Sequence, residues 1–329
     1  MTCVLGIDQG STHTRAAVAA LDGTLLSVAV TPGACHAVHG MERAMQTIRA
    51  AADQALAAAD VRPADLAVLY GGLTGADWDY EYPLLEKNLL ALGLCDHVAV
   101  KNDSIIALRG GTHQPYGAVL ICGTGGNCGV RAPDGREYVY GYFHDQDLQG
   151  GGALTTRVLW AVFRSATGRE AETQLVGWLL KLAGLPTIEA LCQAYFDNRL
   201  TCFAAVPPLL FETAWEGDAV SRKVIAEFAE GCAGLLIAAL KRFEMGRLEF
   251  DIVFSGSVFK GRGHLLAAAI EERVRLHAPW AHYVNARYEP VVGAVLLGLE
   301  HLGITIDERI AANIESSARR RQLLRLHSE

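Results

Sequence analysis

Two short stretches of the chain combine glycine with small hydroxyl residues, which is the composition of a backbone that can wrap a phosphate. The first is GIDQGSTHT at 6–14 and the second is CGTGGNCGV at 122–130, and each includes the end of an apolar run. Residues this small let an anion approach a nest of backbone amides, although they also make ordinary tight turns. The six candidate positions are Gly10, Ser11, Thr12, Gly123, Thr124 and Gly125.

Two aspartates, Asp8 and Asp103, stand at the ends of apolar runs. Asp8 follows the run at 2–7, and Asp103 follows HVAVKN at 97–102, just before a helical segment. An aspartate in such a place can simply cap a turn or the next helix. At the carboxyl edge of an α/β sheet the same side chain can instead project into a site. The residue pattern alone leaves both interpretations open.

The elements that must position these residues follow one order twice. Apolar runs predict strands, the pairs Asp22-Gly23 and Asp134-Gly135 predict hairpins, and Ala- or Leu-rich segments predict helices. The first copy predicts strands at 2–8, 14–21, 24–30, 66–71 and 97–103 and helices at 41–60, 80–92 and from Ser104. The second copy predicts two strands within 117–130, strands at 136–142, 251–258 and 282–288, and helices over most of 153–245, at 263–277 and at 290–302.

This repetition predicts the fold class. Two copies of a β-β-β-α-β-α-β unit imply an α/β protein with two facing domains and a ligand cleft between them. Both glycine turns lead from strand to strand, so neither is a P-loop or a dinucleotide fingerprint, in which the turn opens a helix. We expect a first domain at 1–116 and a second at 117–302, with the tail at 303–329 packing on the first.

Composition narrows the class of partner. The 329 residues carry a formal charge of −7, with a pI near 5.9, which argues against nucleic acid as the main partner. The basic run at 318–327 is expected to form a solvated helix face. Eight scattered cysteines without a C-x-x-C pair, and no apolar stretch approaching ~20 residues, favour reduced thiols, a cytoplasmic location and no membrane partner.

Five stretches in order resemble one known family. They are GIDQGSTHT, GGLTG at 71–75, KNDSIIAL at 101–108, CGTGGNCGVRAPDG at 122–135 and FSGSVFKG at 254–261. Together they resemble the N-acetylglucosamine kinase and BadF/BadG/BcrA/BcrD-type ATPase group of the actin-like, hexokinase-like ATPase superfamily. The likeness covers most of the chain and implies two actin-like (ribonuclease H-like) domains that use ATP and Mg²⁺.

The resemblance also implies a role for individual residues. It assigns Asp8 to Mg²⁺, Asp103 to general base catalysis, and Gly256 and Ser257 to the adenosine, with the two glycine turns on the phosphates. The implied acceptor contacts are Thr74, Gly75, Asn102 and Asn127. An asparagine after glycines can equally be a turn residue, and a plain turn from a strand to a helix predicts the same glycine and serine at 256–257.

The chain departs from the family where relatives have G-W-G-x-x-x-G-D-E-G-S. It reads GYFHDQDLQGGGAL at 141–154, so that Leu148 and Gln149 replace the Asp-Glu pair, while Asp145 and Asp147 lie close by as substitutes. A leucine accepts no hydrogen bond from a sugar hydroxyl. We therefore expect N-acetylglucosamine to be a poor acceptor unless Asp145 or Asp147 reaches the cleft.

Three functions are compatible with these residues. The first is an ATP-dependent kinase acting on a hydroxyl of a sugar or amino sugar, a small-molecule substrate. The second is a BadF-type ATPase that activates a partner enzyme and shares an iron–sulfur cluster across a dimer, for which Cys122 and Cys128 are the candidate pair. The third is a nucleotide- or sugar-binding regulator without turnover. A homodimer is compatible with each.

Overall fold

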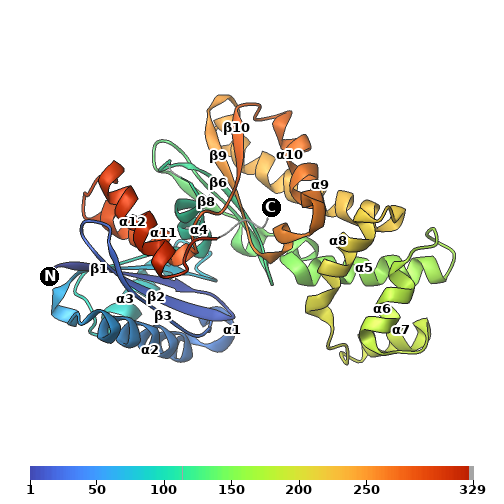
Figure 1. Cartoon of the computed structure of the whole chain (residues 1–329), viewed down its shortest axis with the longest axis horizontal. Helices are drawn as coiled ribbons and strands as arrows, with labels where there is room; N and C mark the ends of the chain where they lie inside the picture. Colours follow the sequence, from blue (N-terminus) through green and yellow to red (C-terminus); the bar gives the residue numbers. More distant parts are fainter. Residues whose placement is uncertain (113, 326–329) are drawn as a thin grey trace.

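The computed structural model describes residues 1–112 and 114–325, which form two mixed five-stranded sheets of identical topology (Figure 1). The first sheet has the order β3-β2-β1-β4-β5 and the second the order β10-β9-β6-β7-β8. In each, the first three strands are antiparallel and the last two run parallel to the first. The duplicated α/β fold predicted from the sequence is therefore confirmed.

The elements of the first sheet and its helices agree closely with the predicted segments. They are β1 (Cys3–Gln9), β2 (His13–Ala20), β3 (Leu25–Pro32), α1 (His36–His39), α2 (Met41–Ala59), β4 (Leu66–Leu73), α3 (Glu81–Leu90), β5 (Val98–Asn102) and α4 (Asp103–Gly111). All seven residues of β1 are buried, because this strand is central in the sheet and helices cover it. Asp8 and Gln9 are the polar residues of this buried strand, and Asp8 lies opposite Arg15 of β2.

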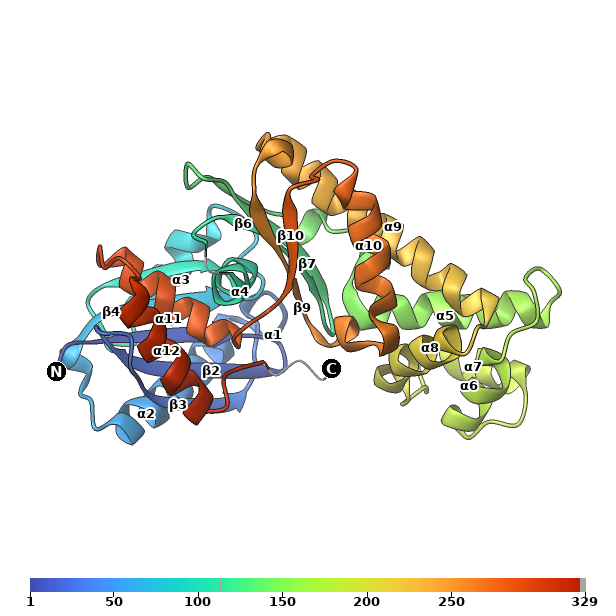
Figure 2. The ribbon, with the colours of Figure 1, turned by 45° about the horizontal axis from the view of Figure 1, so that its top comes forward.

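The second sheet carries a large helical addition. Its elements are β6 (Gly117–Cys122), β7 (Gly126–Arg131), β8 (Glu137–Val139), α5 (Gly150–Ala166), α6 (Leu175–Ala183), α7 (Ile188–Phe196), α8 (Val206–Trp215), α9 (Ala219–Arg242), β9 (Phe250–Ser255), α10 (Leu265–Arg275) and β10 (Ala281–Asn285). Helices α6, α7 and α8 lie at the end of the molecule far from the first sheet (Figure 2). Among the described residues, no single helix is long and apolar enough to cross a membrane, although the bent pair α6 and α7 reaches that limit by length and composition.

Helices α4 and α11 (Pro290–His301) pack on each other between the two sheets. Helix α4 contacts strands of both sheets, whereas α11 contacts β1, β2 and β4 of the first. A Cβ at Gly293 would collide with the carbonyl oxygen of Ile106, so glycine lets the two helices approach this closely. Helix α11, which the sequence assigned to the second domain, thus makes its sheet contacts with the first, and the chain returns there earlier than residue 303.

The segment after α11 corrects the expectation for the basic run. Helix α12 (Glu308–Arg320) packs beside β3, and the helix ends before Arg321. Arg321 Nε donates to the carbonyl oxygen of Leu25 at 2.8 Å. The run is therefore not simply a solvated helix face, because at least one of its arginines is used to hold the chain on the first sheet. Residues 326–329 of the expected tail lie outside the described residues.

Candidate nucleotide and acceptor site

The first glycine turn joins β1 to β2 and is fixed by backbone hydrogen bonds. Gly10 N donates to the carbonyl oxygen of His13 at 2.9 Å, and Gly33 N donates to that of Thr12 at 2.9 Å. A Cβ at Gly33 would collide with the Gly10 carbonyl oxygen, so only glycine fits behind this turn. Ser11 and Thr12 remain exposed at its tip. The turn is thus fixed while its small hydroxyl residues face outward.

The second turn, 122–126, is enclosed by glycines from two other segments. Gly150 at the start of α5 has a φ of +65°, and its Cβ would collide with the carbonyl oxygen of Gly125. Gly256 after β9 has a φ of +112°, and its Cβ would collide with the carbonyl oxygen of Cys122. Gly151 N donates to the carbonyl oxygen of Gly123 at 2.7 Å. The sequence-predicted Gly123, Thr124, Gly125 and Gly256 therefore come together, with a helix N-terminus that sequence reasoning missed.

A cavity of about 530 Å³ opens beside this glycine cluster. Its lining includes Gly123, Thr124, Gly151, Gly152, Phe203, Pro207, Phe211, Ser257, Lys260 and Arg262. Apolar rings and prolines suit a flat base, while the start of a helix and basic side chains suit an anion. The signal for Gly151 and Gly152 was present in the triplet 150–152, but nothing in the helical region marked Phe203 or Pro207 as site residues.

The carboxyl groups of Asp8 and Asp103 lie near enough to influence each other. Burial raises the pKa of Asp8 to about 7, with Arg15 opposing the shift and the charges of Asp103 and Glu289 adding to it. Burial raises the pKa of Asp103 to about 6, and a hydrogen bond from Thr74 opposes that shift. The Arg15 Nη1 to Asp8 Oδ2 distance is 3.7 Å. Each group is therefore poised to exchange a proton or accept a cation near neutral pH.

The cap of helix α4 is Asn102 rather than Asp103. Asn102 Oδ1 accepts hydrogen bonds from Ser104 N at 2.9 Å and from Ser104 Oγ at 2.6 Å, and the Asn102 side chain is fully buried. Asp103 is the first residue of the helix and is only half-buried. Of the two interpretations that the sequence left open for Asp103, capping of this helix is thus taken by its neighbour.

Asn102 and Asn127 form a hydrogen bond between the two halves of the molecule, one built on the first sheet and the other on the second. Asn127 Nδ2 donates to Asn102 Oδ1 at 3.3 Å, and Asn127 Oδ1 accepts from Gly141 N at 3.1 Å. Asn102 Nδ2 donates to Asp77 Oδ1 at 2.7 Å. The pKa of Asp77 is raised to about 6 by burial and by the charge of Asp103. Asp77 is a carboxylate of this region that sequence reasoning missed, although it lies only two residues after the end of GGLTG.

Thr74 and Gly75 lie in the turn that leads from β4 towards Asp77. Thr74 N donates to the carbonyl oxygen of Gln9 at 2.9 Å, which ties this turn to the end of β1. Gly75 has a φ of +77°, and a Cβ there would lie 2.7 Å from Cys35 Sγ. The structure therefore brings Thr74, Asn102, Asp103 and Asn127 to one place between the sheets.

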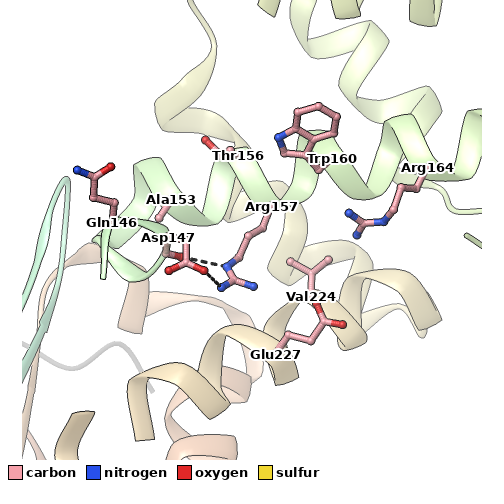
Figure 3. A pocket seen from close by; sticks show the side chains of 9 residues that line it. All are labelled: Gln146, Asp147, Ala153, Thr156, Arg157, Trp160, Arg164, Val224 and Glu227. Atoms are coloured by element: carbon pink, nitrogen blue, oxygen red, sulfur yellow. Dashed lines mark hydrogen bonds and ion pairs between the residues drawn. The ribbon is translucent and has the colours of Figure 1, made fainter. Parts of the chain in front are cut away.

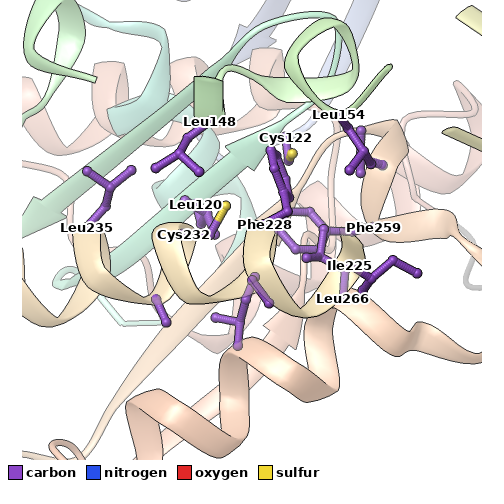
Figure 4. Close-up of a cluster of buried hydrophobic side chains, with 14 of the residues drawn as sticks. Leu120, Cys122, Leu148, Leu154, Ile225, Phe228, Cys232, Leu235, Phe259 and Leu266 are labelled. Atoms are coloured by element: carbon purple, nitrogen blue, oxygen red, sulfur yellow. The ribbon is translucent and has the colours of Figure 1, made fainter. Parts of the chain in front are cut away.

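Asp147 and Leu148 point elsewhere. Asp147 Oδ2 accepts from Arg157 Nη2 at 2.7 Å, and both side chains line a separate cavity of about 470 Å³ with Trp160 (Figure 3). Leu148 is buried among core side chains near Cys232 (Figure 4). In the described part of the chain, neither Asp147 nor the exposed Asp145 hydrogen-bonds to the residues around Asp103.

His144 is a further residue of this loop that the sequence did not single out. Its side chain is 2% exposed, and neither ring nitrogen has a hydrogen-bond partner among the described residues. A Cβ at Gly126 would lie 3.2 Å from the His144 ring, so the ring packs against the start of β7. Burial lowers the pKa of His144, because desolvation disfavours the charged ring.

A duplicated five-stranded α/β fold with a glycine-lined cavity beside its second hairpin is the actin-like ATPase fold. The model of the BadF/BadG/BcrA/BcrD ATPase family matches residues 5–298. The chain therefore belongs to this family, as its motifs predicted.

Two curated relatives are named as amino-sugar kinases. The N-acetyl-D-glucosamine kinase of Dictyostelium discoideum is 27% identical over 247 residues, which are 69% of this chain and 74% of the relative. The N-acetylmuramic acid/N-acetylglucosamine kinase of Clostridium acetobutylicum is 24% identical over 302 residues, which are 90% of this chain and 98% of the relative.

Solved structures agree on the fold. A candidate N-acetylglucosamine kinase from Chromobacterium violaceum superposes with a TM-score of 0.68 at 20% identity, over 91% of this chain and 99% of that one. A ROK family glucokinase from Streptomyces griseus, in complex with glucose and AMPPNP, superposes with a TM-score of 0.59 at 20% identity, over 91% of this chain and 98% of that one.

Proposed function

We propose that this protein is an ATP-dependent kinase that transfers the γ-phosphoryl group to a hydroxyl of a sugar or amino sugar. The observation that carries the proposal is the position of Asp103. Its carboxyl is not the cap of α4, has a pKa raised to about 6, and lies between the halves beside Thr74 and the Asn102–Asn127 pair. A base whose pKa lies near the working pH suits removal of a hydroxyl proton.

Asp8 would hold Mg²⁺, which neutralises triphosphate charge when it is bound. Mg²⁺ typically takes one or two protein carboxylates and keeps several waters, so a single aspartate is a sufficient protein ligand. Asp8 fits because it is 8% exposed and its nearest cation, on Arg15, is 3.7 Å away, which leaves its charge poorly compensated. The two glycine turns would bind the phosphates, and the cavity at 530 Å³ would bind the adenosine.

Asp103 would then accept the proton of the acceptor hydroxyl as the phosphoryl group transfers. Thr74 stabilises the ionised form of Asp103 by its hydrogen bond. Enclosure of the acceptor between the halves would exclude water, which otherwise competes as the phosphoryl acceptor.

Asp77 would replace the missing acidic pair as the carboxylate that accepts hydrogen bonds from the acceptor. It is held by Asn102 at 2.7 Å and lies close enough to Asp103 for their charges to interact. Asp147 is engaged by Arg157 and Leu148 lies in the core, so neither supports such a role. Because neither Asp145 nor Asp147 hydrogen-bonds to the residues around Asp103 in the described part of the chain, N-acetylglucosamine stays an expected poor acceptor. Amino sugars and neutral sugars of other shape are the alternatives to compare.

The cysteines favour a kinase over a partner-activating ATPase. Cys122 and Cys128 are 1% and 0% exposed, and both belong to one buried core cluster together with Cys232. Figure 4 shows Cys122 and Cys232 among its apolar side chains. A cluster shared across a dimer needs thiolates at a surface, and burial raises the pKa of both thiols. A regulator without turnover has no comparable observation in its favour.

The test is a coupled ADP-release screen with Mg·ATP over amino sugars, neutral sugars and polyols. We expect acceptor-dependent ADP release by the wild-type protein and almost none by Asp103→Asn at the same ATP occupancy. Phosphorylated product should be identified by mass spectrometry. ATP hydrolysis that no acceptor stimulates would overturn the kinase proposal in favour of an ATPase.

A further inference from the structure

The segment that follows α12 is held against the linker between β10 and α11. Glu289 N donates to the carbonyl oxygen of Leu323 at 2.9 Å, and Arg325 N donates to that of Arg287 at 3.0 Å. Tyr288 and Leu324 form a β-bridge between these hydrogen bonds. Because the backbone is fixed on both sides of Leu324, the side chain that follows it is presented in a defined direction.

That side chain is Arg325, and its guanidinium connects the two halves of the molecule. Nε donates to Glu289 Oε1 at 3.1 Å, at the N-terminus of α11, which packs on the first sheet. Nη1 donates to Ser255 Oγ at 2.9 Å, at the end of β9 in the second sheet. Ser255 is 4% exposed and directly precedes Gly256 of the glycine cluster.

A continuous line of charged groups runs from Arg325 to Asp8. Glu289 Oε2 lies 3.7 Å from Arg15 Nη1, and the same nitrogen lies 3.7 Å from Asp8 Oδ2. One end of this line is next to the turn proposed for the adenosine, and the other end is the proposed metal carboxylate. A triphosphate bound between the proposed adenosine turn and the proposed metal carboxylate would lie near this line.

We propose that the C-terminal segment completes the triphosphate site by presenting Arg325 to the phosphates of the bound nucleotide. This rests on the proposed function, because it assumes that ATP occupies the cleft. A guanidinium has five N–H donors, and three are engaged by Glu289 and Ser255 within the described residues, so that others remain for a phosphate oxygen. Arginine suits phosphate because its donors form a planar fork.

The part of ATP that Arg325 would contact is the phosphate chain and not the nucleoside. The guanidinium of Arg325 donates hydrogen bonds to the hydroxyl of Ser255 and to the carboxylate of Glu289. The cavity side chains that would contact a base belong to other elements. Loss of Arg325 should therefore weaken binding of ATP while leaving binding of adenosine unchanged.

The experiment measures equilibrium binding of ATP and adenosine by calorimetry to the full-length wild-type protein, Arg325→Gln, Arg325→Lys and the control Arg320→Gln. Arg320 is an exposed basic residue at the end of α12 that bonds only to Ser316 within the described chain. We expect Arg325→Gln to weaken ATP binding about ten- to hundredfold, the loss typical of one charge-assisted contact, and to leave adenosine within twofold. Arg325→Lys should recover part of the loss, and Arg320→Gln should bind like the wild type.

Thermal unfolding of each variant without ligand accompanies the titrations, so that a folding defect is recognised. ATP binding undiminished in Arg325→Gln, with wild-type binding intact, would overturn this inference alone. An equal loss of ATP and adenosine would also overturn it, because a residue that only ties the halves together would affect both ligands. Wild-type protein that does not bind ATP would overturn the proposed function, and this inference with it.

Discussion

The two halves of the molecule share one topology but use their first hairpins differently. In the first half Gly33 packs behind the turn at 10–12, and Asp8 lies opposite Arg15 on the two strands that this turn joins. In the second half the turn at 123–125 is enclosed by glycines from α5 and from the end of β9, and a cavity opens beside it.

This difference suggests how a duplicated fold divides a reaction between its copies. The first half carries the carboxylates Asp8, Asp77 and Asp103, whose pKa values burial raises towards neutrality. The second half carries the close backbone approaches and the apolar lining that suit a nucleotide. Loss of the base Asp103 in the first half should therefore affect turnover, and changes around the cavity of the second half should affect nucleotide binding.

The largest expected effect tests the acidic half. Asp103→Asn keeps the shape of the side chain but cannot accept a proton, so turnover should fall about 10² to 10⁴-fold while Mg·ATP binding is retained. Steady-state kinetics measures the turnover, and calorimetry on the same preparation measures Mg·ATP binding. Asp53→Asn, an exposed change on α2, is the matched control. Turnover within a few-fold of wild type would remove Asp103 from catalysis.

The next effect tests the glycine cluster of the second half. In Gly150→Ala the new Cβ would collide with the Gly125 carbonyl oxygen, and the φ of +65° would be strained. We expect the rise in Tm caused by Mg·ATP to disappear, because a ligand stabilises the fold only as far as it binds. Gly177→Ala, at a helix position with open space around it, should keep the full rise. An undiminished rise in Gly150→Ala would separate this cluster from the nucleotide.

A smaller effect distinguishes two carboxylates. Asp77→Asn should lower kcat/KM for the best acceptor about ten- to hundredfold, because a neutral amide replaces a charge-assisted acceptor. Asp147→Asn should leave kcat/KM within about twofold, since its carboxylate pairs with Arg157 at an exposed position. The reverse result would mean that the loop at 141–149 rearranges on binding and that Asp147 supplies the missing clasp.

The smallest effect is the pH dependence of wild-type kcat/KM. The base must be ionised, and the pKa of Asp103 is raised to about 6, so activity is full above that value and lost below it. Between pH 6 and pH 5 the ionised fraction falls from about one half to about one eleventh, so we expect a decline of about fivefold. A profile that stays flat to pH 5 would contradict the raised pKa of the free enzyme.

The same pKa has a consequence for stability with the opposite sign. A carboxyl whose pKa is higher in the folded than in the unfolded chain binds its proton more tightly when folded, so its ionisation above pH 6 disfavours the fold. Asp103→Asn should therefore raise the Tm at pH 7 relative to wild type, and the difference should shrink towards pH 5. An Asp103→Asn variant that is less stable at pH 7 would indicate a structural role for the carboxylate.

Sequence alone determined the features that depend on local patterns. The strand and turn signals repeated in one order, and they predicted the duplicated sheets within a few residues at most boundaries. The glycine turns and Asp103 were found because each lies at a strand end, where the residue type is set by backbone geometry over a few positions.

Tertiary structure decided what depends on partners distant in the chain. The pattern KND could not tell which residue caps α4, because Asn102 is oriented by Asp77 and Asn127 from other elements. Helix α11 was apolar enough for either half, and its glycine contact with α4 decided its place. The sequence predicted a solvated helix face for the basic run. In the structure the β-bridge between Tyr288 and Leu324 places Arg325 within hydrogen-bonding distance of Ser255. Packing over long sequence separations selects these contacts, and no local periodicity records them.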